Sequence, residues 1–293
     1  MKKIIALLLS ALLCVSLLAA CGNSSSDAPK GSAAGSGAAA VPAADTLSGE
    51  INVFAAASLT ESMNQIIAKF QEAHPGVTVT ANYGSSGTLV DQIKEGAACD
   101  LFVSAASKQM NQIDITADPE VNTDGSDFVV QGTRLDLLEN KCVLAVPEGN
   151  PANINSFDDL KESFAQPDFL FAMGGESVPV GAYTQKIFAF LGLNEEELAL
   201  LGKITYGEDV KGVTSAISEG TAKAGVIYGS DAYSAGLTAV DTATEEMTGG
   251  KVIYPAALIS TGTNAEVAAA FLEYLQGVDA GAIFESVGFS TLK

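Results

Sequence analysis

The sequence predicts an α/β fold with two lobes, each a mostly parallel sheet flanked by helices, and a ligand cleft between the lobes. From residue 49 onward, short apolar segments typical of buried strands alternate with helical patterns, as in sheets covered on both faces. These segments fall into two sets, 49–145 and 146–254. Several of the expected strands end in small residues that carry hydrogen-bond donors. Ligands of open α/β sheets bind beyond the carboxyl ends of strands, so these residues predict a binding site.

The first twenty residues have the pattern of a signal peptide. Two lysines precede an apolar run that is slightly short for a membrane-spanning helix. The run ends in Leu-Ala-Ala-Cys at 18–21, which resembles a bacterial lipobox and implies cleavage before Cys21 and lipidation of its sulfur. An ordinary secreted protein with a chance cysteine is the alternative. Residues 21–48 are rich in Gly, Ser, Ala and Pro, which predicts a flexible tether.

The segment 51–60 predicts a strand, a tight turn and a helix. Its first half is rich in strand formers, and apolar residues from Leu59 onward recur at helical spacing. Ser58 occupies the expected N-cap, and Glu61 follows three residues later, as in a capping box. A helix start also suits an anion, because its first N–H groups lack partners and lie at the positive end of the dipole. Capping alone is the simpler interpretation of Ser58.

The alternation continues along the chain. The first set has further strands at 77–81, 100–104 and 142–146, a helix at 89–95 and a polar surface excursion over 111–133. The second set has strands at 169–173, 204–206 and 224–228. A late strand at 251–259 and two helices, 265–275 and 280–286, close the chain. We expect 49–145 with 255–293 to form the first lobe and 146–254 the second, with hinges near 145 and 254.

The composition excludes several classes of function. The formal net charge is −20, with 15 basic against 35 acidic residues, so non-specific nucleic-acid binding is not expected. The four cysteines form no Cys-x-x-Cys pair, which argues against zinc and iron–sulfur sites. No cofactor and no cation ligand is therefore expected. A disulfide between Cys99 and Cys142 stays open, since the sequence gives no distance between them.

Catalytic interpretations are weak. His74 is the only histidine, so it is the only candidate base for a Ser-His-Asp triad. The segment 84–88 departs from the Gly-x-Ser-x-Gly elbow because Thr88 occupies the second Gly position. Paired acids at 158–159 and 195–197 fall at helix starts, where they favour the dipole. We expect no enzyme, and a secreted hydrolase that uses Ser86 is the alternative of a different class.

Binding interpretations are stronger. Small, donor-bearing residues follow four strand ends, and a tyrosine hydroxyl lies at a fifth: 57–58, 84–86, 180–181, 209–210 and Tyr228. Lys and Arg are absent from these segments. A ring of hydroxyl and backbone N–H donors suits a small, fully ionised oxyanion held by neutral dipoles. Burying such a charge is costly without full hydrogen bonding, so the donors must be numerous.

These segments resemble those of periplasmic-type molybdate-binding proteins of ABC importers. The resemblance covers 49–293 and is carried by motifs at 53–60, 84–89, 99–105, 178–183, 208–212 and 225–232. It implies the two-lobed periplasmic-binding-protein fold of type II. In that family two serines, two backbone amides and a tyrosine hold the oxyanion. Matched motif to motif, these are Ser58, Ser86, Val180, Val210 and Tyr228, with Ser85 as the alternative to Ser86.

The resemblance further implies an extracytoplasmic protein, lipid-anchored to the cell membrane, that captures molybdate and tungstate and delivers them to a membrane permease. Lobe closure around the anion is the expected mechanism. We expect a monomer that contacts the membrane only through its anchor. Another small oxyanion such as sulfate is the alternative ligand. A carboxylate receptor would normally offer an Arg, and Arg134, the sole Arg, lies away from the strand ends.

Overall fold

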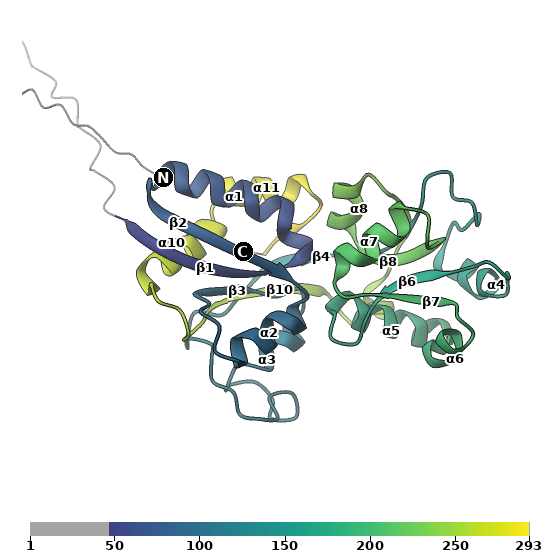
Figure 1. Cartoon of the computed structure of the whole chain (residues 1–293), viewed down its shortest axis with the longest axis horizontal. Coiled ribbons are helices and arrows are strands. Elements are labelled where there is room, and N and C mark those ends of the chain that lie inside the picture. Colours follow the sequence, from purple (N-terminus) through teal and green to yellow (C-terminus); the bar gives the residue numbers. More distant parts are fainter. Residues whose placement is uncertain (1–46, 293) are drawn as a thin grey trace, which may run out of the picture. The chain divides into compact units, whose positions relative to one another are not determined.

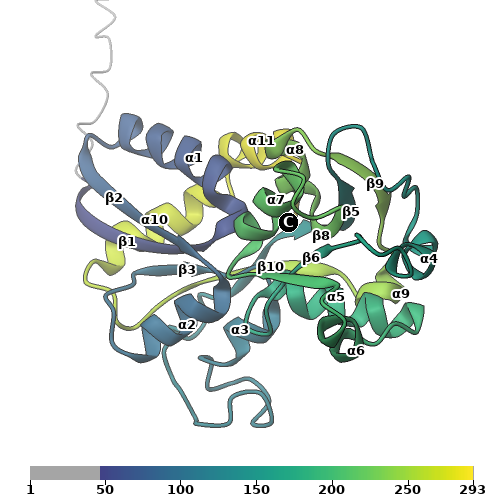
Figure 2. The same cartoon turned by 45° about the vertical axis from the view of Figure 1, so that its right-hand side comes forward.

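A computed structural model of the chain describes residues 47–292. Within this range the chain forms two β-sheets flanked by helices (Figures 1 and 2). The predicted signal peptide, Cys21 and nearly all of the predicted tether lie outside the described residues. The first strand begins at Ser48, the last residue assigned to the tether.

The first lobe is built on a six-stranded sheet with the order β11-β4-β10-β3-β1-β2. Its strands are β1 (Ser48–Ala56), β2 (Gly76–Gly84), β3 (Leu101–Val103), β4 (Leu135–Asn140), β10 (Val252–Leu258) and β11 (Ser290–Thr291). β1 is parallel to β2 and β3, whereas β10, β4 and β11 add antiparallel pairs. Ala56 pairs with Gly84, so β1 and β2 end side by side.

Helices cover both faces of this sheet. They are the 3-10 turn η1 (Ala57–Leu59), α1 (Thr60–Ala73), α2 (Ser86–Lys94), α3 (Ser107–Asn111), α10 (Ala265–Leu275) and α11 (Val278–Ser286). α1, α10 and α11 pack together on one face, and α2 and α3 lie on the other (Figure 1). Phe70 of α1 packs against Phe271 of α10 with ring centroids 4.9 Å apart, which joins two segments distant in sequence.

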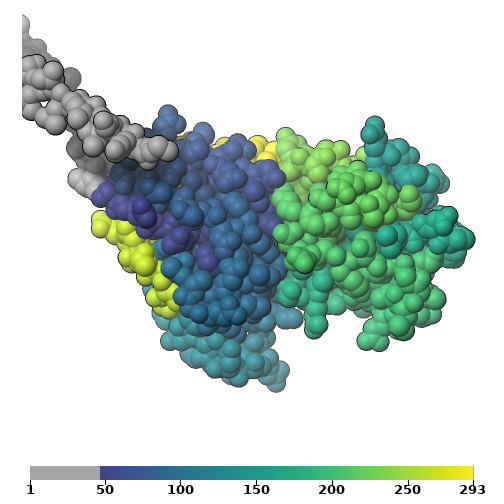
Figure 3. Space-filling model, viewed as in Figure 1, coloured from purple at the N-terminus to yellow at the C-terminus, as the bar shows by residue number. Residues whose placement is uncertain are grey.

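The second lobe is built on a five-stranded sheet with the order β7-β6-β8-β5-β9. Its strands are β5 (Cys142–Val146), β6 (Phe171–Gly174), β7 (Ile204–Gly207), β8 (Ala224–Tyr228) and β9 (Thr238–Thr242). Its helical segments are η2 (Phe157–Asp159), α4 (Leu160–Phe164), α5 (Pro179–Leu191), α6 (Glu195–Leu200), α7 (Val210–Ser218), α8 (Gly229–Ala235) and α9 (Glu245–Thr248). Figure 3 shows residues of α1 and α2 in contact with residues of the second lobe along one face.

Two expectations differ from this architecture. The sheets are mixed rather than mostly parallel, because β5 and β9 pair antiparallel in the second sheet as β4, β10 and β11 do in the first. The lobe boundaries also shift. β5 pairs with β8 and β9, so the chain leaves the first sheet at Lys141 and not near 145. It returns between Thr242 and Val252, ahead of the expected 254. Local patterns mark strands but do not identify their partners.

The polar excursion over 111–133 begins at Asn111, the last residue of α3, and beyond it has no regular helix or strand apart from an isolated bridge between Val129 and Ile259. Arg134 anchors it: its Nη1 lies 2.7 Å from Asp114 Oδ2, and its Nη2 donates to Asn111 Oδ1 at 2.6 Å. The sole Arg is therefore structural.

Cys99 and Cys142 are both buried, free thiols, so the disulfide left open by the sequence is not formed. Among residues 47–292, no single helix is long and apolar enough to cross a membrane; α10 and α11 pass that test only as a pair bent by 59°.

Candidate functional site

A small cavity lies where the carboxyl ends of parallel strands from the two sheets meet. Its wall consists of Ala56, Ala57, Ser58, Gly84, Ser85, Ser86, Ala105, Val178, Pro179, Val180, Val210 and Tyr228. All five residues matched to the family's ligand contacts, and the alternative Ser85, therefore line one space. Its volume of about 10 Å³ has room for roughly one water molecule. The wall contains no acidic, basic or histidine side chain.

Ser58 does not cap α1 as the sequence predicts. It lies in the 3-10 turn η1, where Ala56 is the N-cap, and the N-cap of α1 is Leu59; neither end has a side-chain cap. The buried Ser58 Oγ instead lies 3.0 Å from Tyr254 Oη. The capping-box interpretation is wrong because the extra turn moves the helix start past Ser58.

The two serines at the start of α2 have different partners. Ser85 is the N-cap: its Oγ accepts from Thr88 N at 3.2 Å and lies 3.1 Å from Thr88 Oγ1. Ser86 is buried, and its Oγ accepts the N–H of Ala105 at 3.0 Å. Because that N–H can only donate, the hydroxyl hydrogen of Ser86 is left for another acceptor. Ser86 is therefore the better donor toward the cavity.

Val180 and Val210 bring helix N-termini to the wall. Val180 is in the first turn of α5, and Val210 is the first residue of α7, whose N-cap Asp209 accepts from Gly212 N at 2.9 Å. N–H groups at these positions have no acceptor within their own helix. Among residues 47–292, neither N–H makes a hydrogen bond outside its helix. Two backbone donors at positive dipole ends therefore stand at the cavity.

Tyr228 closes the wall at the end of β8. Its hydroxyl is buried and has no hydrogen-bond partner among the described residues. Burial first, and then the neighbouring Tyr254, raises the pKa of Tyr228 well above its usual range, so the phenol stays protonated. A neutral hydroxyl left without a partner on this wall suits an acceptor-bearing ligand.

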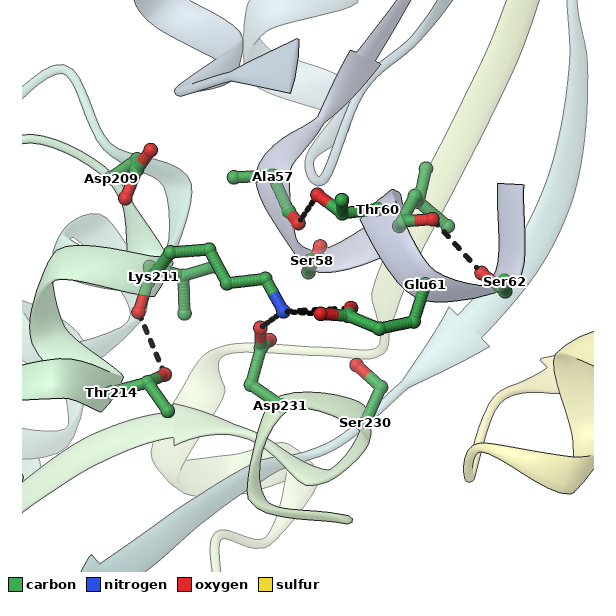
Figure 4. A network of polar contacts seen from close by, with 12 residues as sticks. Ala57, Ser58, Thr60, Glu61, Ser62, Asp209, Lys211, Thr214, Ser230 and Asp231 are labelled. Atoms are coloured by element: carbon green, nitrogen blue, oxygen red, sulfur yellow. Dashed lines mark hydrogen bonds and ion pairs between the residues drawn. The ribbon is translucent and has the colours of Figure 1, made fainter. Parts of the chain in front are cut away.

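An ion pair crosses between the lobes beside the cavity (Figure 4). Lys211 Nζ of α7 lies 2.7 Å from Glu61 Oε2 of α1 and 3.3 Å from Asp231 Oδ1 of α8. Glu61 and Lys211 are partly exposed, and exposed pairs contribute little to stability. Asp231 is only 1% exposed. Burial raises its pKa to about 7, although Lys211 acts to lower it.

This buried carboxyl predicts a pH-dependent stability. The folded chain holds the Asp231 proton more tightly than the unfolded chain, so the stabilisation is complete below about pH 4 and is lost as pH rises through 7. Asp231→Asn keeps the shape and stays neutral. At pH 8 its free energy of unfolding should exceed wild type by on the order of 4 kcal/mol at most, and at pH 4 the two should agree. Denaturant unfolding at both pH values measures this, with exposed Asp136→Asn as control. An equal difference at both pH values would contradict the assignment.

A larger groove adjoins the cavity at Pro179, which lines both. Its volume is about 550 Å³, and Lys108, Lys186 and Lys251 line it in a chain whose net charge is −20. Lys251 Nζ pairs with Glu139 Oε2 at 2.8 Å. Among the described residues, Lys108 and Lys186 have no ion-pair partner. The groove is thus locally basic.

The partners that hold Ser58 and Ser86 in place carry no clear signal in the sequence. Ala105 lies within the motif at 99–105, but a backbone N–H contact does not depend on the residue type and leaves no mark in the sequence. Tyr254, the partner of Ser58, lies on the sheet strand β10, and Asn140 of β4 lies 3.3 Å from its hydroxyl. The one available signal was a tyrosine inside an otherwise apolar strand, since a buried hydroxyl needs a partner.

Comparison with known proteins assigns the chain to a family. The family model described as bacterial extracellular solute-binding protein matches residues 51–290. The molybdate-binding protein ModA of Escherichia coli strain K12 is 35% identical over 245 residues, which cover 83% of this chain and 89% of that protein. The putative ABC transporter substrate-binding lipoprotein YvgL of Bacillus subtilis strain 168 is 34% identical over 242 residues, covering 82% and 86%.

Solved structures agree. The substrate-binding domain of a putative molybdenum ABC transporter from Clostridium difficile matches with a TM-score of 0.59 and 31% identity, covering 83% of this chain and 99% of that one. The periplasmic molybdate-binding protein of Azotobacter vinelandii matches with a TM-score of 0.68 at 20% identity, covering 83% and 100%, which supports the fold. These relatives are solute-binding proteins. The chain therefore belongs to the family of bacterial extracellular solute-binding proteins.

Proposed function

We propose that this chain is the substrate-binding component of an ABC importer and that it captures molybdate, and also tungstate, in the cavity between its lobes. The observation that carries the proposal is the wall itself, which has no charged side chain. It contains four hydroxyl residues and two residues at helix N-termini: Ser58, Ser85, Ser86, Tyr228, Val180 and Val210. The names of the relatives from E. coli and C. difficile agree with this ligand.

The chemistry of the wall favours a fully ionised dianion. Molybdate and tungstate carry four acceptor oxygens and no proton at neutral pH, so every contact calls for a donor. Hydrogen phosphate would need an acceptor among these groups. Neutral dipoles can hold a dianion when the donors are numerous and fixed in place. Sulfate also has only acceptor oxygens, so it is the second candidate. It is smaller than molybdate, and a titration can compare the affinities of the two anions.

Ligand capture then requires both lobes. Ser58 and Ser86 belong to the first lobe, whereas Val180, Val210 and Tyr228 belong to the second. An oxyanion bound to all five draws the lobes together, and the crossings at Lys141 and at 243–251 are the expected hinges. Five heavy atoms need more room than one water, so the wall must widen locally around a bound anion while the lobes stay closed.

The remaining assignments follow from this role. The protein acts outside the cytoplasm, held to the membrane by a lipid on Cys21, and presents its closed form to a permease as a monomer without a cofactor. A serine hydrolase at Ser86 is disfavoured, because the only histidine, His74, is not part of the wall around Ser86 and packs against Phe70 with ring centroids 4.5 Å apart.

Calorimetric titration of the purified protein with molybdate, tungstate, sulfate and phosphate tests the function. Tight binding of the first two and weak binding of the others is the expected result. Tight sulfate with weak molybdate would favour the second candidate. Silence from all four anions would overturn the proposal, and an assay for ester hydrolysis would then follow.

Tyr228→Phe should have opposite effects on binding and on stability. Without its hydroxyl the variant should bind molybdate about 10- to 100-fold more weakly, because a hydrogen bond to a charged group contributes about 1.5–3 kcal/mol. Without ligand its melting temperature should rise, because the buried hydroxyl has no partner to lose. Titration and thermal unfolding measure the two effects, with Tyr233→Phe, an exposed tyrosine of α8, as control. A lower melting temperature would show that the hydroxyl has a partner in the free protein.

The lysines of the groove should speed anion capture. Lys108→Gln with Lys186→Gln should slow association with molybdate several-fold at low ionic strength, since local charge steers association by about 10-fold or more. The difference should vanish at high salt, where charges are screened within about 3 Å at 1 M. Stopped-flow measurement checks this, with Lys69→Gln on α1 as control. Equal rates at low salt would contradict the role of the groove.

A further inference from the structure

A chain of hydrogen bonds leads from the crossing between the lobes to the cavity. Asn140, the last residue of β4, places its Nδ2 3.3 Å from Tyr254 Oη and 2.9 Å from Ser230 Oγ. Tyr254 Oη in turn lies 3.0 Å from Ser58 Oγ. All four side chains are buried, so water does not compete for these bonds.

Asn140 fixes the donor-to-acceptor direction of these hydrogen bonds. Asn140 Oδ1 accepts the N–H of Lys141 at 2.8 Å, which sets the orientation of the amide and leaves Nδ2 to face Tyr254. Because Nδ2 can only donate, Tyr254 Oη must accept from it. The hydroxyl hydrogen of Tyr254 then goes to Ser58 Oγ. The opposite direction would leave that hydrogen buried without an acceptor, which is costly.

We propose that Tyr254 and Asn140 are positioning residues that hold Ser58 as a hydrogen-bond donor toward the anion. Once Ser58 Oγ accepts a hydrogen bond from Tyr254, the hydroxyl hydrogen of Ser58 is free to donate into the cavity. This inference rests on the proposed function, since it assigns a task at the same site. It adds two residues that do not line the cavity and that act only through Ser58.

Ser86, the other serine that we propose contacts the anion, is positioned in the same way by a different donor. Ser86 Oγ accepts the N–H of Ala105 at 3.0 Å, so its hydrogen is also left for the cavity. Each serine oxygen therefore accepts a hydrogen bond from a fixed donor. For Ser86 the donor is a backbone N–H, and for Ser58 it is the Tyr254 hydroxyl, whose direction Asn140 sets. Both hydroxyls are thereby set as donors before an anion arrives, which suits a ligand with acceptor oxygens alone.

The burial of Tyr254 keeps its hydroxyl protonated. Tyr254 is fully buried, and desolvation, followed by the charge of Asp231, raises its pKa well above the usual range. The phenol of Tyr254 therefore stays protonated around neutral pH, so the donor-to-acceptor direction of these hydrogen bonds does not change with pH.

A double-mutant cycle tests the proposal by calorimetric titration with molybdate. Tyr254→Phe should weaken binding about tenfold, the value of one ordinary hydrogen bond. In a Ser58→Ala background the same change should cost nothing further, because Tyr254 then has no hydroxyl to position. In a Ser86→Ala background it should again cost about tenfold. Anion concentrations up to millimolar keep the weak variants measurable.

The cycle separates positioning from packing. Tyr183→Phe, another buried tyrosine next to Tyr228, is the matched control and should leave the affinity unchanged. Thermal unfolding without ligand reports whether each variant is folded. Losses from Tyr254→Phe that add in the Ser58→Ala background would overturn the positioning role while leaving the proposed function intact. A wild-type chain that binds none of the four anions would overturn both.

Discussion

Replacing Gly87 by alanine should weaken molybdate binding by about 100-fold without unfolding either lobe. Gly87 lies on α2 of the first lobe, and an added Cβ would stand 2.4 Å from the carbonyl oxygen and 2.9 Å from the Cβ of Ser177. Ser177 precedes α5 of the second lobe. The clash is with backbone, which cannot rotate away. Overpacking of this kind costs about 1–3 kcal/mol, and here it falls on the closed arrangement of the lobes alone.

The free protein should respond differently from the complex. Gly87 is inside α2, where alanine is more favourable than glycine by about 1 kcal/mol, so the melting temperature without ligand should not fall. Gly281→Ala inside α11 of the same lobe is the matched control, because its Cβ would approach only Thr291 Cγ2, at an ordinary 3.4 Å. Titration of both variants decides the matter. Wild-type affinity in Gly87→Ala would show that bound lobes do not approach as closely as α2 and Ser177 do here.

Local signals explain why much of the fold could be predicted. The strand at 224–228 and the helix at 265–275 are found with the expected bounds, because one is a short apolar run between turns and the other has clear helical spacing. β4 was missed: it lies in a polar stretch and has only partial burial. Its stability comes from β10 and β11 on its two sides, and both neighbours are remote in sequence.

The candidate site shows the same division. Ser86, Val180, Val210 and Tyr228 stand at ends of parallel strands or in the first turns of helices, which local patterns and the family motifs both mark. They therefore fall on one wall as expected. The partner of Ser58 could not be predicted. Tyr254 is 196 residues away in sequence, and the capping-box pattern offered a nearer and wrong explanation.

Ser86→Ala should weaken molybdate binding about 10- to 100-fold and should also lower the stability of the free protein. The substitution removes a donor to a charged ligand, which costs about 1.5–3 kcal/mol. It also leaves the buried N–H of Ala105 without its acceptor, at a cost of about 1–3 kcal/mol in the free protein as well. Both the affinity and the melting temperature should therefore fall, in contrast to Tyr228→Phe, whose melting temperature should rise.

Ser85→Ala decides which of the two neighbouring serines contacts the anion. As the N-cap of α2, Ser85 uses its hydroxyl to bond Thr88. Removing this hydroxyl should therefore lower the free energy of unfolding by about 0.5–2 kcal/mol and change the affinity for molybdate little. Ser86 has no such task within the helix. If Ser85→Ala instead abolished binding while Ser86→Ala only lowered stability, the ligand contact would belong to Ser85, and the Ala105 N–H would be a purely structural partner of Ser86. The two variants thus separate a cap from a ligand at adjacent positions that the sequence motif alone cannot tell apart.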